Sequence, residues 1–363
     1  MKIKIFEDLI KEVHEVGICQ QCGGCVSFCN SIENEVIDFK EPNLPPEYIN
    51  RKKCLECGIC YLICPQTHLL DEDLNKTFKF SDFSLMPIGF VDNIYSCQSM
   101  DKDFLKYGTD GGVVNTLINY LIEKKIIEGA IVAKTKSPFS REAIIAKSKE
   151  DLIDASGTKL DISTQLDTVQ KFHTYTSSLP NLRRYKFRKL AFVGTPCQIY
   201  TIRCMQNLGI IPSENIEICL GLFCYENFFF DRIKLRQFEE QFKIKFKNIK
   251  RINIKENLII ELKDHKTSQN LINISFKELK DYMRPACEFC KDFTNIYADI
   301  SFGGLGSPDK FTTVITRTKK GKDIIHRIIK TGMINCLSID SSIKKKMKEK
   351  IIQFSQFKLE RNK

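Results

Sequence analysis

Two short stretches of the sequence carry four cysteines each with the same spacing. The first reads CQQCGGCVSFCN from residue 19 to residue 30, and the second reads CLECGICYLICP from residue 54 to residue 65. Cysteine thiolates spaced C-x2-C-x2-C-x3-C bind [4Fe-4S] clusters, and the fourth cysteine of each run can cross to the cluster of the other run. The repeated spacing therefore predicts two iron–sulfur clusters in the N-terminal part of the chain.

The crossed arrangement assigns a complete set of ligands to each cluster. One cluster takes the set Cys19, Cys22, Cys25 and Cys64, and the other takes the set Cys54, Cys57, Cys60 and Cys29. Glycines between the cysteines (Gly23, Gly24, Gly58) let the loops pass close to inorganic sulfide. Pro65 follows Cys64 as this motif expects, whereas Asn30 replaces the usual proline after Cys29. The alternative, a pair of structural zinc sites, normally uses separate C-x2-C units and fits this spacing poorly.

Four other cysteines lie where ligands are favoured, and four do not. Cys197 follows a strand in VGTPCQ, Cys224 ends a strand in GLFCYENF, and RPACEFC holds Cys287 and Cys290. Backbone N–H groups at strand ends and helix starts stabilise thiolates, so this set suits one further cluster. Spacing alone leaves Cys197 equally open to the role of a nucleophile or a buried apolar residue. The remaining set, which we interpret as structural, is Cys97, Cys204, Cys219 and Cys336.

The elements that must position these cysteines change along the chain. After the cysteine runs, residues 71–89 are charged and then marked by Pro and Gly, which indicates a linker. Strand-like and helical stretches then alternate, with helices expected at 111–127 and 195–209 and strands at 128–134, 189–194 and 215–224. This alternation predicts a largely parallel α/β sheet with ligands at the carboxyl ends of its strands. Residues 243–264 break the pattern with an expected antiparallel hairpin.

Composition limits the classes of function. The chain has 363 residues, 16 cysteines and a formal charge of +11, with no apolar run long enough to span a bilayer. Its charged amphipathic N-terminus is unlike a secretory signal, so we expect a cytoplasmic protein in which the cysteines are ligands and not disulfides. Three clusters and a dinucleotide flavin would lower the net charge to about +3, so the basic excess does not require nucleic acid. We expect the Lys-rich C-terminus to be a solvated helix face.

A glycine-rich turn precedes the first helix of the α/β part. The sequence GTDGGVVNTLINYL offers Thr109 and Asp110 as helix N-caps, followed by Gly111, Gly112 and Val113. Such an entry presents backbone N–H groups to a phosphate or to the electron-rich edge of a flavin. Taken alone this signal is weak, because most capped helices bind no ligand.

Five motifs follow one another in the order GTDGGVVNTLINYL, SGTKL, VGTPCQ, GLFCYENF and RPACEFCKDFTNIYADISFGGLG. Through these motifs the chain resembles, from about residue 85 to residue 335, the beta-subunit family of coenzyme F420 hydrogenases and dehydrogenases. It is most similar to the electron-input subunit of F420H2 dehydrogenases. The resemblance implies FAD, a [4Fe-4S] cluster in the catalytic domain and a deazaflavin substrate. It places FAD near Thr109, Asp110, Gly111, Gly112, Val113, Thr158 and Lys159, and it gives the additional cluster to Cys197, Cys224, Cys287 and Cys290. Gly-Thr-Lys-Leu at 157–160 departs from the family's Gly-Ser-Lys-Tyr, so a tyrosine contact is lost.

Together these observations predict three parts. We expect a ferredoxin-like α+β domain with two [4Fe-4S] clusters at 1–80, a mixed α/β domain with FAD and a [4Fe-4S] cluster at 85–340, and a basic tail at 341–363. The expected reaction moves hydride between coenzyme F420 and FAD, with Lys159 stabilising charge on the flavin unless it is a surface lysine. Single electrons then pass through three clusters to or from a redox partner: ferredoxin, a membrane dehydrogenase complex, or a protein of the formate dehydrogenase or heterodisulfide reductase type.

Three alternatives remain open. The chain could be a ferredoxin-dependent reductase of another substrate in the same superfamily, because a fold carries over more safely than a substrate. It could also be an electron-carrier subunit without its own substrate, which the absence of flavin would favour. A zinc-dependent nucleic-acid binder is disfavoured, because the aromatic and basic motif of an RNA-binding fold is missing.

Overall fold

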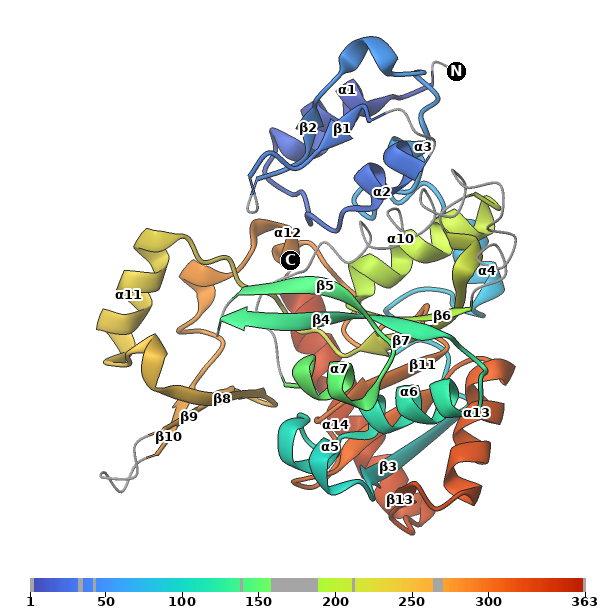
Figure 1. Ribbon diagram of the computed structural model, residues 1–363, viewed down its shortest axis with the longest axis vertical. Helices are drawn as coiled ribbons and strands as arrows, with labels where there is room; N and C mark the ends of the chain where they lie inside the picture. Colours follow the sequence, from blue (N-terminus) through green and yellow to red (C-terminus); the bar gives the residue numbers. More distant parts are fainter. Residues whose placement is uncertain are drawn as a thin grey trace.

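A large mixed sheet forms the centre of the molecule (Figure 1). The computed structural model describes residues 3–31, 35–41, 44–137, 140–157, 189–210, 213–263 and 270–361. Within these residues, eight strands form the sheet in the order β13 (Ile334–Cys336), β3 (Asn93–Ser99), β12 (Thr312–Thr316), β11 (Ile300–Gly303), β7 (Ile216–Leu222), β6 (Leu190–Gly194), β4 (Gly129–Ser137) and β5 (Ser140–Ala146).

The strand directions agree with the predicted α/β class. The pairs β4–β6, β6–β7 and β7–β11 are parallel, whereas β5, β12 and β13 run against their neighbours. Because β12 is antiparallel to both β11 and β3, strand β3 runs in the same direction as the parallel set. Five strands therefore end at one edge of the sheet, and the predicted alternation of strands and helices is confirmed.

Helices cover both faces of this sheet. One face packs against α5 (Lys102–Tyr107), α6 (Val113–Glu123), α7 (Lys149–Asp154) and α13 (Lys319–Lys330). The other face packs against α4 (Asp71–Thr77), α10 (Pro196–Asn207) and α14 (Ser341–Glu360). In β6, Ala191 and Val193 join the first core while Leu190 and Phe192 join the second. A strand buried on both sides is apolar at every position, which is why LAFVG reads as a continuous apolar run.

The cysteine runs belong to an N-terminal segment (residues 3–70) that lies at one end of the molecule in Figure 1. Its elements are α1 (Phe6–Leu9), the π-helix η1 (Ile10–His14), α2 (Gly24–Ser31), β1 (Ile37–Asp38), β2 (Glu47–Tyr48), the 3-10 helix η2 (Arg51–Lys53) and α3 (Ile59–Leu62). A small core that includes Phe6, Leu9, Ile37 and Tyr61 packs against several of the cysteines.

The predicted linker is instead an ordered part of the α/β core. Residues 71–77 form α4, and the hydroxyl of Tyr200 on α10 donates to Asp71 (2.7 Å). The hydroxyl of Tyr297 donates to Asn75 (2.6 Å), and Phe78 packs edge-to-face on the ring of Tyr297. The charged residues are exposed on a helix whose other side is buried, and this amphipathic pattern was mistaken for a linker.

An antiparallel excursion leaves the sheet, as predicted for residues 243–264. Strands β8 (Ile249–Ile254), β9 (Leu258–Leu262) and β10 (Leu271–Ile274) form their own sheet around an aromatic core. The elements that flank these strands in the chain are α11 (Arg232–Phe242), η4 (Phe246–Asn248), η5 (Lys280–Tyr282) and α12 (Pro285–Glu288), whereas η3 (Ser213–Asn215) directly precedes β7 of the main sheet.

The C-terminal helix α14 is solvated on one side only. Met347, Ile351, Ser355 and Lys358 are buried against the sheet, while most of its other lysines are exposed. The expectation of a solvated helix face therefore holds for the exposed side of α14. The opposite side, which includes Lys358, is buried, and nothing in a Lys-rich segment distinguishes one buried lysine from the exposed ones.

Two cysteines that we expected to remain reduced form a disulfide. Cys97 on β3 and Cys336 on β13 are opposite each other in an antiparallel pair and are joined by an S–S bond. They are 239 residues apart in sequence, so their spacing gave no indication of the pairing. Cys204 and Cys219 are buried in the core, consistent with a structural role.

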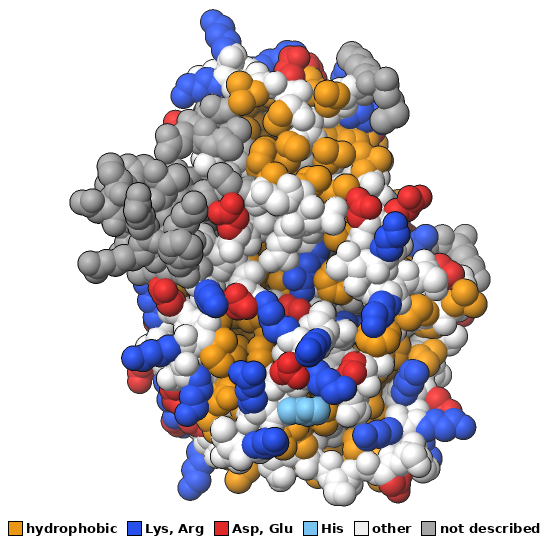
Figure 2. Space-filling model, turned by 90° about the vertical axis from the view of Figure 1, so that its right-hand side faces the viewer, with side chains coloured by type: hydrophobic (Ala, Val, Ile, Leu, Met, Phe, Trp, Pro, Cys, Tyr) orange, Lys and Arg blue, Asp and Glu red, His pale blue; other side chains and the backbone are white. Residues whose placement is uncertain are grey.

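Surface charge is mixed on the face seen in Figure 2. Lys and Arg are spread over the lower part among scattered Asp and Glu, and hydrophobic side chains gather near the top, where the N-terminal segment lies. Across the described ranges, we find no helix with the length and apolar character needed to cross a membrane.

Candidate functional site: three cysteine groups and a glycine-rich turn

The residues singled out in the sequence gather at the edge where the parallel strands end. Cys197 follows β6 and Cys224 follows β7. The glycine-rich turn lies at the same edge, because the N–H of Gly111 donates to the hydroxyl of Thr312 at the start of β12 (3.0 Å). The carboxyl ends of parallel strands are where α/β proteins usually bind ligands, so the fold brings the candidate residues to the expected place.

Cys197, Cys224, Cys287 and Cys290 come together beside α12. Cys197 lies in the first turn of α10, and the hydroxyl of the N-cap residue Thr195 is 3.2 Å from its sulfur. The side chain of Asn227 donates to Cys224 Sγ (3.7 Å), while its backbone N–H donates to Cys287 Sγ (3.4 Å). We call these four cysteines the inner group. Hydrogen bonds to ligand sulfurs are a means by which proteins set cluster potentials.

Cys287 is buried and the other three cysteines of the inner group are partly buried, and this changes the acid–base chemistry of the group. Burial, followed by repulsion from neighbouring cysteines, holds the pKa of Cys197 well above its usual value. Burial likewise raises the pKa of Cys224 to about 12 and that of Cys287 to about 11. In these surroundings burial outweighs the stabilisation of thiolates by backbone N–H groups that we expected. The raised pKa values of Cys197, Cys224 and Cys287 keep these metal-free thiols protonated at neutral pH, and iron must displace those protons on binding.

Cysteines of the two runs lie close to each other in two groups with the membership of the crossed pattern. We call the set Cys19, Cys22, Cys25 and Cys64 the middle group. The pKa of Cys25 is raised mainly by burial, and Cys22, Cys19 and Cys64 raise it further, so the four thiols are electrostatically coupled. The set Cys29, Cys54, Cys57 and Cys60, the outer group, is coupled in the same way around Cys60. Cys60 also acts on Cys25, so the two groups are neighbours.

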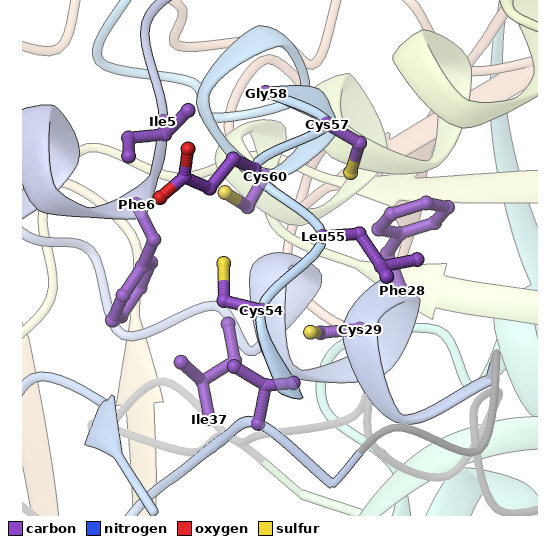
Figure 3. A pocket seen from close by; sticks show the side chains of 12 residues that line it. Ile5, Phe6, Phe28, Cys29, Ile37, Cys54, Leu55, Cys57, Gly58 and Cys60 are labelled. Atoms are coloured by element: carbon purple, nitrogen blue, oxygen red, sulfur yellow. The ribbon is translucent and has the colours of Figure 1, made fainter. Parts of the chain in front are cut away.

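The outer group surrounds a cavity. All four of its cysteines line a space of about 390 Å³, including its opening to solvent, together with Phe6, Phe28, Ile37 and Leu55. Figure 3 shows the four sulfurs ranged around this space, from α2 on one side and the second cysteine run on the other. Within the described ranges, no three Cys, His, Asp or Glu side chains converge tightly enough to hold one metal ion. The ligands of a cubane each bind a different iron atom and stand farther apart.

Direct contacts join the middle group to the inner group. Cys22 Sγ is 3.7 Å from the hydroxyl of Thr201, which in turn donates to the carbonyl of Cys197 one helical turn earlier (3.1 Å). Gln20 donates to the carbonyl of Ala286 on α12 (3.1 Å), and Arg284 donates to Gln21 (2.6 Å). The N-terminal segment is thus docked directly over the inner group.

The glycine-rich turn differs from its prediction in one respect. Helix α6 begins at Val113 with Gly112 as its N-cap and without a side-chain cap, so Thr109 and Asp110 are not its caps. Asp110, 7% exposed, is drawn instead toward β8, where Asn253 donates to it (3.4 Å) and Lys255 Nζ is 3.6 Å away. Burial raises the pKa of Asp110, and Lys255 opposes the rise. The N-cap residue Gly112 has no side chain with which to cap the N–H groups at the start of α6.

Two of the predicted residues, Thr158 and Lys159, lie outside the described residues. Sequence reasoning also missed residues that touch the cysteine groups. Asn227 lies in the motif GLFCYENF, and its place three residues after Cys224 was the only feature of the sequence that pointed to it. Tyr48, whose hydroxyl donates to Cys54 Sγ (4.0 Å), and Lys358 gave no signal, because single tyrosines and lysines carry no spacing pattern.

Two family models match the α/β part of the chain. Both describe the beta subunit of coenzyme F420 hydrogenase/dehydrogenase: the model of its N-terminal part matches residues 94–170, and the model of its C-terminal part matches residues 187–342. The coenzyme F420 hydrogenase subunit beta of Methanothermobacter thermautotrophicus is 30% identical over 260 residues, 70% of this chain and 87% of that protein. The chain belongs to the coenzyme F420 hydrogenase/dehydrogenase beta-subunit family. Membership of this beta-subunit family confirms the resemblance drawn from the motifs.

Relatives of the beta-subunit family match different extents of the chain. The coenzyme F420-dependent sulfite reductase of Methanocaldococcus jannaschii is 27% identical over 360 residues, which are 95% of this chain and 51% of that protein. A chain in the structure of the F420-reducing [NiFe] hydrogenase complex from Methanosarcina barkeri is similar with 28% identity and a TM-score of 0.63, covering 76% of this chain and 93% of that one. The family models begin at residue 94 and do not include the N-terminal segment.

Replacing Gly111 with alanine tests the glycine-rich turn. A Cβ there would lie 2.6 Å from the carbonyl oxygen of Cys97 and 2.9 Å from the backbone nitrogen of Thr312, and neither atom can swing away. We expect a loss of about 1–3 kcal/mol in the free energy of unfolding and a fall in retained flavin. Gly332→Ala is the control, because its Cβ meets open space and its positive φ alone costs about 1 kcal/mol. Equal flavin retention in the two variants would show that the turn does not hold the flavin.

Proposed function

We propose that this beta-subunit-family oxidoreductase transfers hydride between coenzyme F420 and FAD and passes single electrons through three [4Fe-4S] clusters to or from a partner protein. The observation that carries the proposal is the contiguity of the three cysteine groups. They extend from the carboxyl edge of the sheet, through Cys22 and Thr201, to the surface at Cys57. The choice of a deazaflavin substrate rests on the names of the relatives, which include coenzyme F420.

The glycine-rich turn supports a flavin at the carboxyl edge. When bound, FAD supplies the two-electron to one-electron conversion that a hydride donor and an iron–sulfur cluster require. Residues 109–113 would hold it, with the uncapped first turn of α6 donating N–H groups. The buried Oδ1 atom of Asn253, next to Asp110, lacks a hydrogen-bond partner among the described residues and would provide an acceptor. Arg251 and Lys255 on the same strand face offset the charge of Asp110, which keeps the turn compatible with an anionic cofactor.

The three cysteine groups suit cubane clusters in number, chemistry and arrangement. Each group offers four thiols, and when bound a [4Fe-4S] cluster supplies one-electron chemistry. Cys197, Cys224 and Cys287 would hold the inner cluster away from water, while Thr195 and Asn227 orient their sulfurs. Gln20, Gln21 and Arg284 fix the N-terminal segment over it, so that the middle group follows directly.

The outer group supports electron exchange with a partner at the surface. Cys57 is exposed, and the neighbouring Leu55 is 68% exposed. Lys52 and Lys53, also exposed, come just before Cys54. An apolar contact with basic residues at its rim suits a redox partner that presents an acidic surface, because complementary charge steers association.

The deciding experiment measures turnover under anaerobic conditions. Protein purified with its clusters intact is analysed for flavin and iron, then mixed with reduced coenzyme F420 and an artificial one-electron acceptor. We expect one flavin, about twelve iron atoms per chain and oxidation of the deazaflavin. Full cofactor content without deazaflavin turnover would contradict the proposed substrate and favour the ferredoxin-dependent reductase. Clusters without flavin would favour an electron-carrier subunit.

A further inference from the structure

A lysine of the C-terminal helix is buried beside the inner group. Lys358, in the last turn of α14, is 1% exposed. Its Nζ donates to the carbonyl of Cys224 (2.7 Å) and to the carbonyl of Asp292 (2.7 Å). The thiol of Cys290 donates to that same Asp292 oxygen (3.7 Å). The ammonium group is thus held by backbone atoms that belong to, or contact, two inner-group cysteines.

The charges around Lys358 come from several elements. On its own helix, Arg361 forms an ion pair with Glu226, so these two charges largely offset each other. The Asp292 side chain accepts from the backbone N–H groups of Asn295 and Ile296, but burial outweighs these hydrogen bonds and raises the pKa of its carboxyl group. Burial lowers the pKa of Lys358, whereas negative charge on Cys290, Cys224 and Cys287, which these cysteines would carry as thiolate ligands of a cluster, raises it. Burying an ammonium group is costly without such compensation.

We propose that Lys358 is a positioning residue that raises the reduction potential of the cluster held by the inner group, an inference that rests on the proposed function. Reduction of that cluster adds one electron from a bound flavin and takes up no proton at Lys358, so the site gains one negative charge. A fixed positive charge in a dry site stabilises the reduced state more than the oxidised state. The inner cluster then accepts electrons more readily than it would beside a neutral side chain.

The test compares reduction potentials in the full-length protein. Lys358→Met removes both charge and hydrogen bonds, and Lys358→Gln removes the charge but keeps a donor for the two carbonyls, which protects the fold. Lys348→Met changes an exposed lysine of the same helix and serves as the matched control. Redox titrations followed by electron paramagnetic resonance give the potentials, and the spectrum of Cys287→Ala identifies the signals of the other two clusters.

We expect both Lys358 variants to lower the inner-cluster potential, with a reduction equilibrium at least tenfold less favourable, or about 59 mV for one electron. The other two clusters and Lys348→Met should be unchanged. An unshifted inner cluster in Lys358→Gln would overturn the inference, as would an equal shift in all three clusters. A wild-type protein with only about eight iron atoms would instead refute the proposed function.

Discussion

The Cys287→Ala protein should retain about eight of about twelve iron atoms and lose electron transfer from flavin to the N-terminal clusters. Cys287 is buried and accepts the backbone N–H of Asn227, so its loss removes a ligand that no exposed residue can replace. The middle and outer groups do not include this residue and should load normally. Iron analysis and stopped-flow reduction by the deazaflavin measure both effects, with electron transfer falling to the background rate.

Cys219→Ala is the matched control for this prediction. Cys219 lies in β7, is fully buried and belongs to none of the three groups. It should keep the full iron content and the parent rate, at a stability cost of about 1 kcal/mol for the lost sulfur. If Cys287→Ala reduced its N-terminal clusters as fast as the parent protein, the inner group would not be the relay.

Removing the iron should unfold the N-terminal segment and leave the α/β sheet folded. The core of that segment is small, and cysteines of the middle and outer groups form part of its packing. Burial raises the pKa of Cys19 to about 12 and that of Cys29 to about 11, so these two metal-free thiols are neutral at physiological pH. In small metal-dependent domains the free energy of metal binding is a large part of the free energy of folding.

Hydrogen exchange measured by mass spectrometry reports this unfolding region by region. After oxidation and chelation, amides of α2 and α3 should exchange within seconds, whereas those of β6 and β7 in the same sample keep their protection and serve as the internal control. The thiol pKa values lie above neutrality, so acid should favour loss of iron and alkaline pH should oppose it. Persistent protection of α2 and α3 without iron would show that docking against α10 and α12 suffices.

Local patterns in the sequence were enough to predict much of the fold. The apolar run LAFVG and the capped helix after it became β6 and α10, and the alternation in residues 249–262 became the β8–β9 hairpin. Spacing also predicted which N-terminal cysteines are electrostatically coupled, because the repeated C-x2-C-x2-C-x3-C run is a recognisable pattern; their role as cluster ligands stays a prediction. Each of these signals is contained within a few residues of chain.

What sequence reasoning missed depends on contacts between distant residues. The Cys97–Cys336 bond joins strands that become neighbours only when the sheet is assembled. The inner group draws cysteines from three separate stretches: their places at strand ends, at a helix start and in a C-x2-C unit suggested the set, and spacing alone left the role of Cys197 open until the family motifs were considered. The burial of Lys358 arises from the path of α14 across the sheet, and α4 looked like a linker because its buried contacts come from Tyr200 and Tyr297.

The position of α14 also has a consequence for biosynthesis. Every inner-group cysteine precedes this helix in the chain, so Lys358 leaves the ribosome after all four of them. Until α14 docks, the carbonyls of Cys224 and Asp292 lack the ammonium group that covers them in the finished protein. All four inner-group cysteines are therefore synthesised before the helix that covers these carbonyls, which leaves an interval for delivery of iron and sulfide before α14 docks.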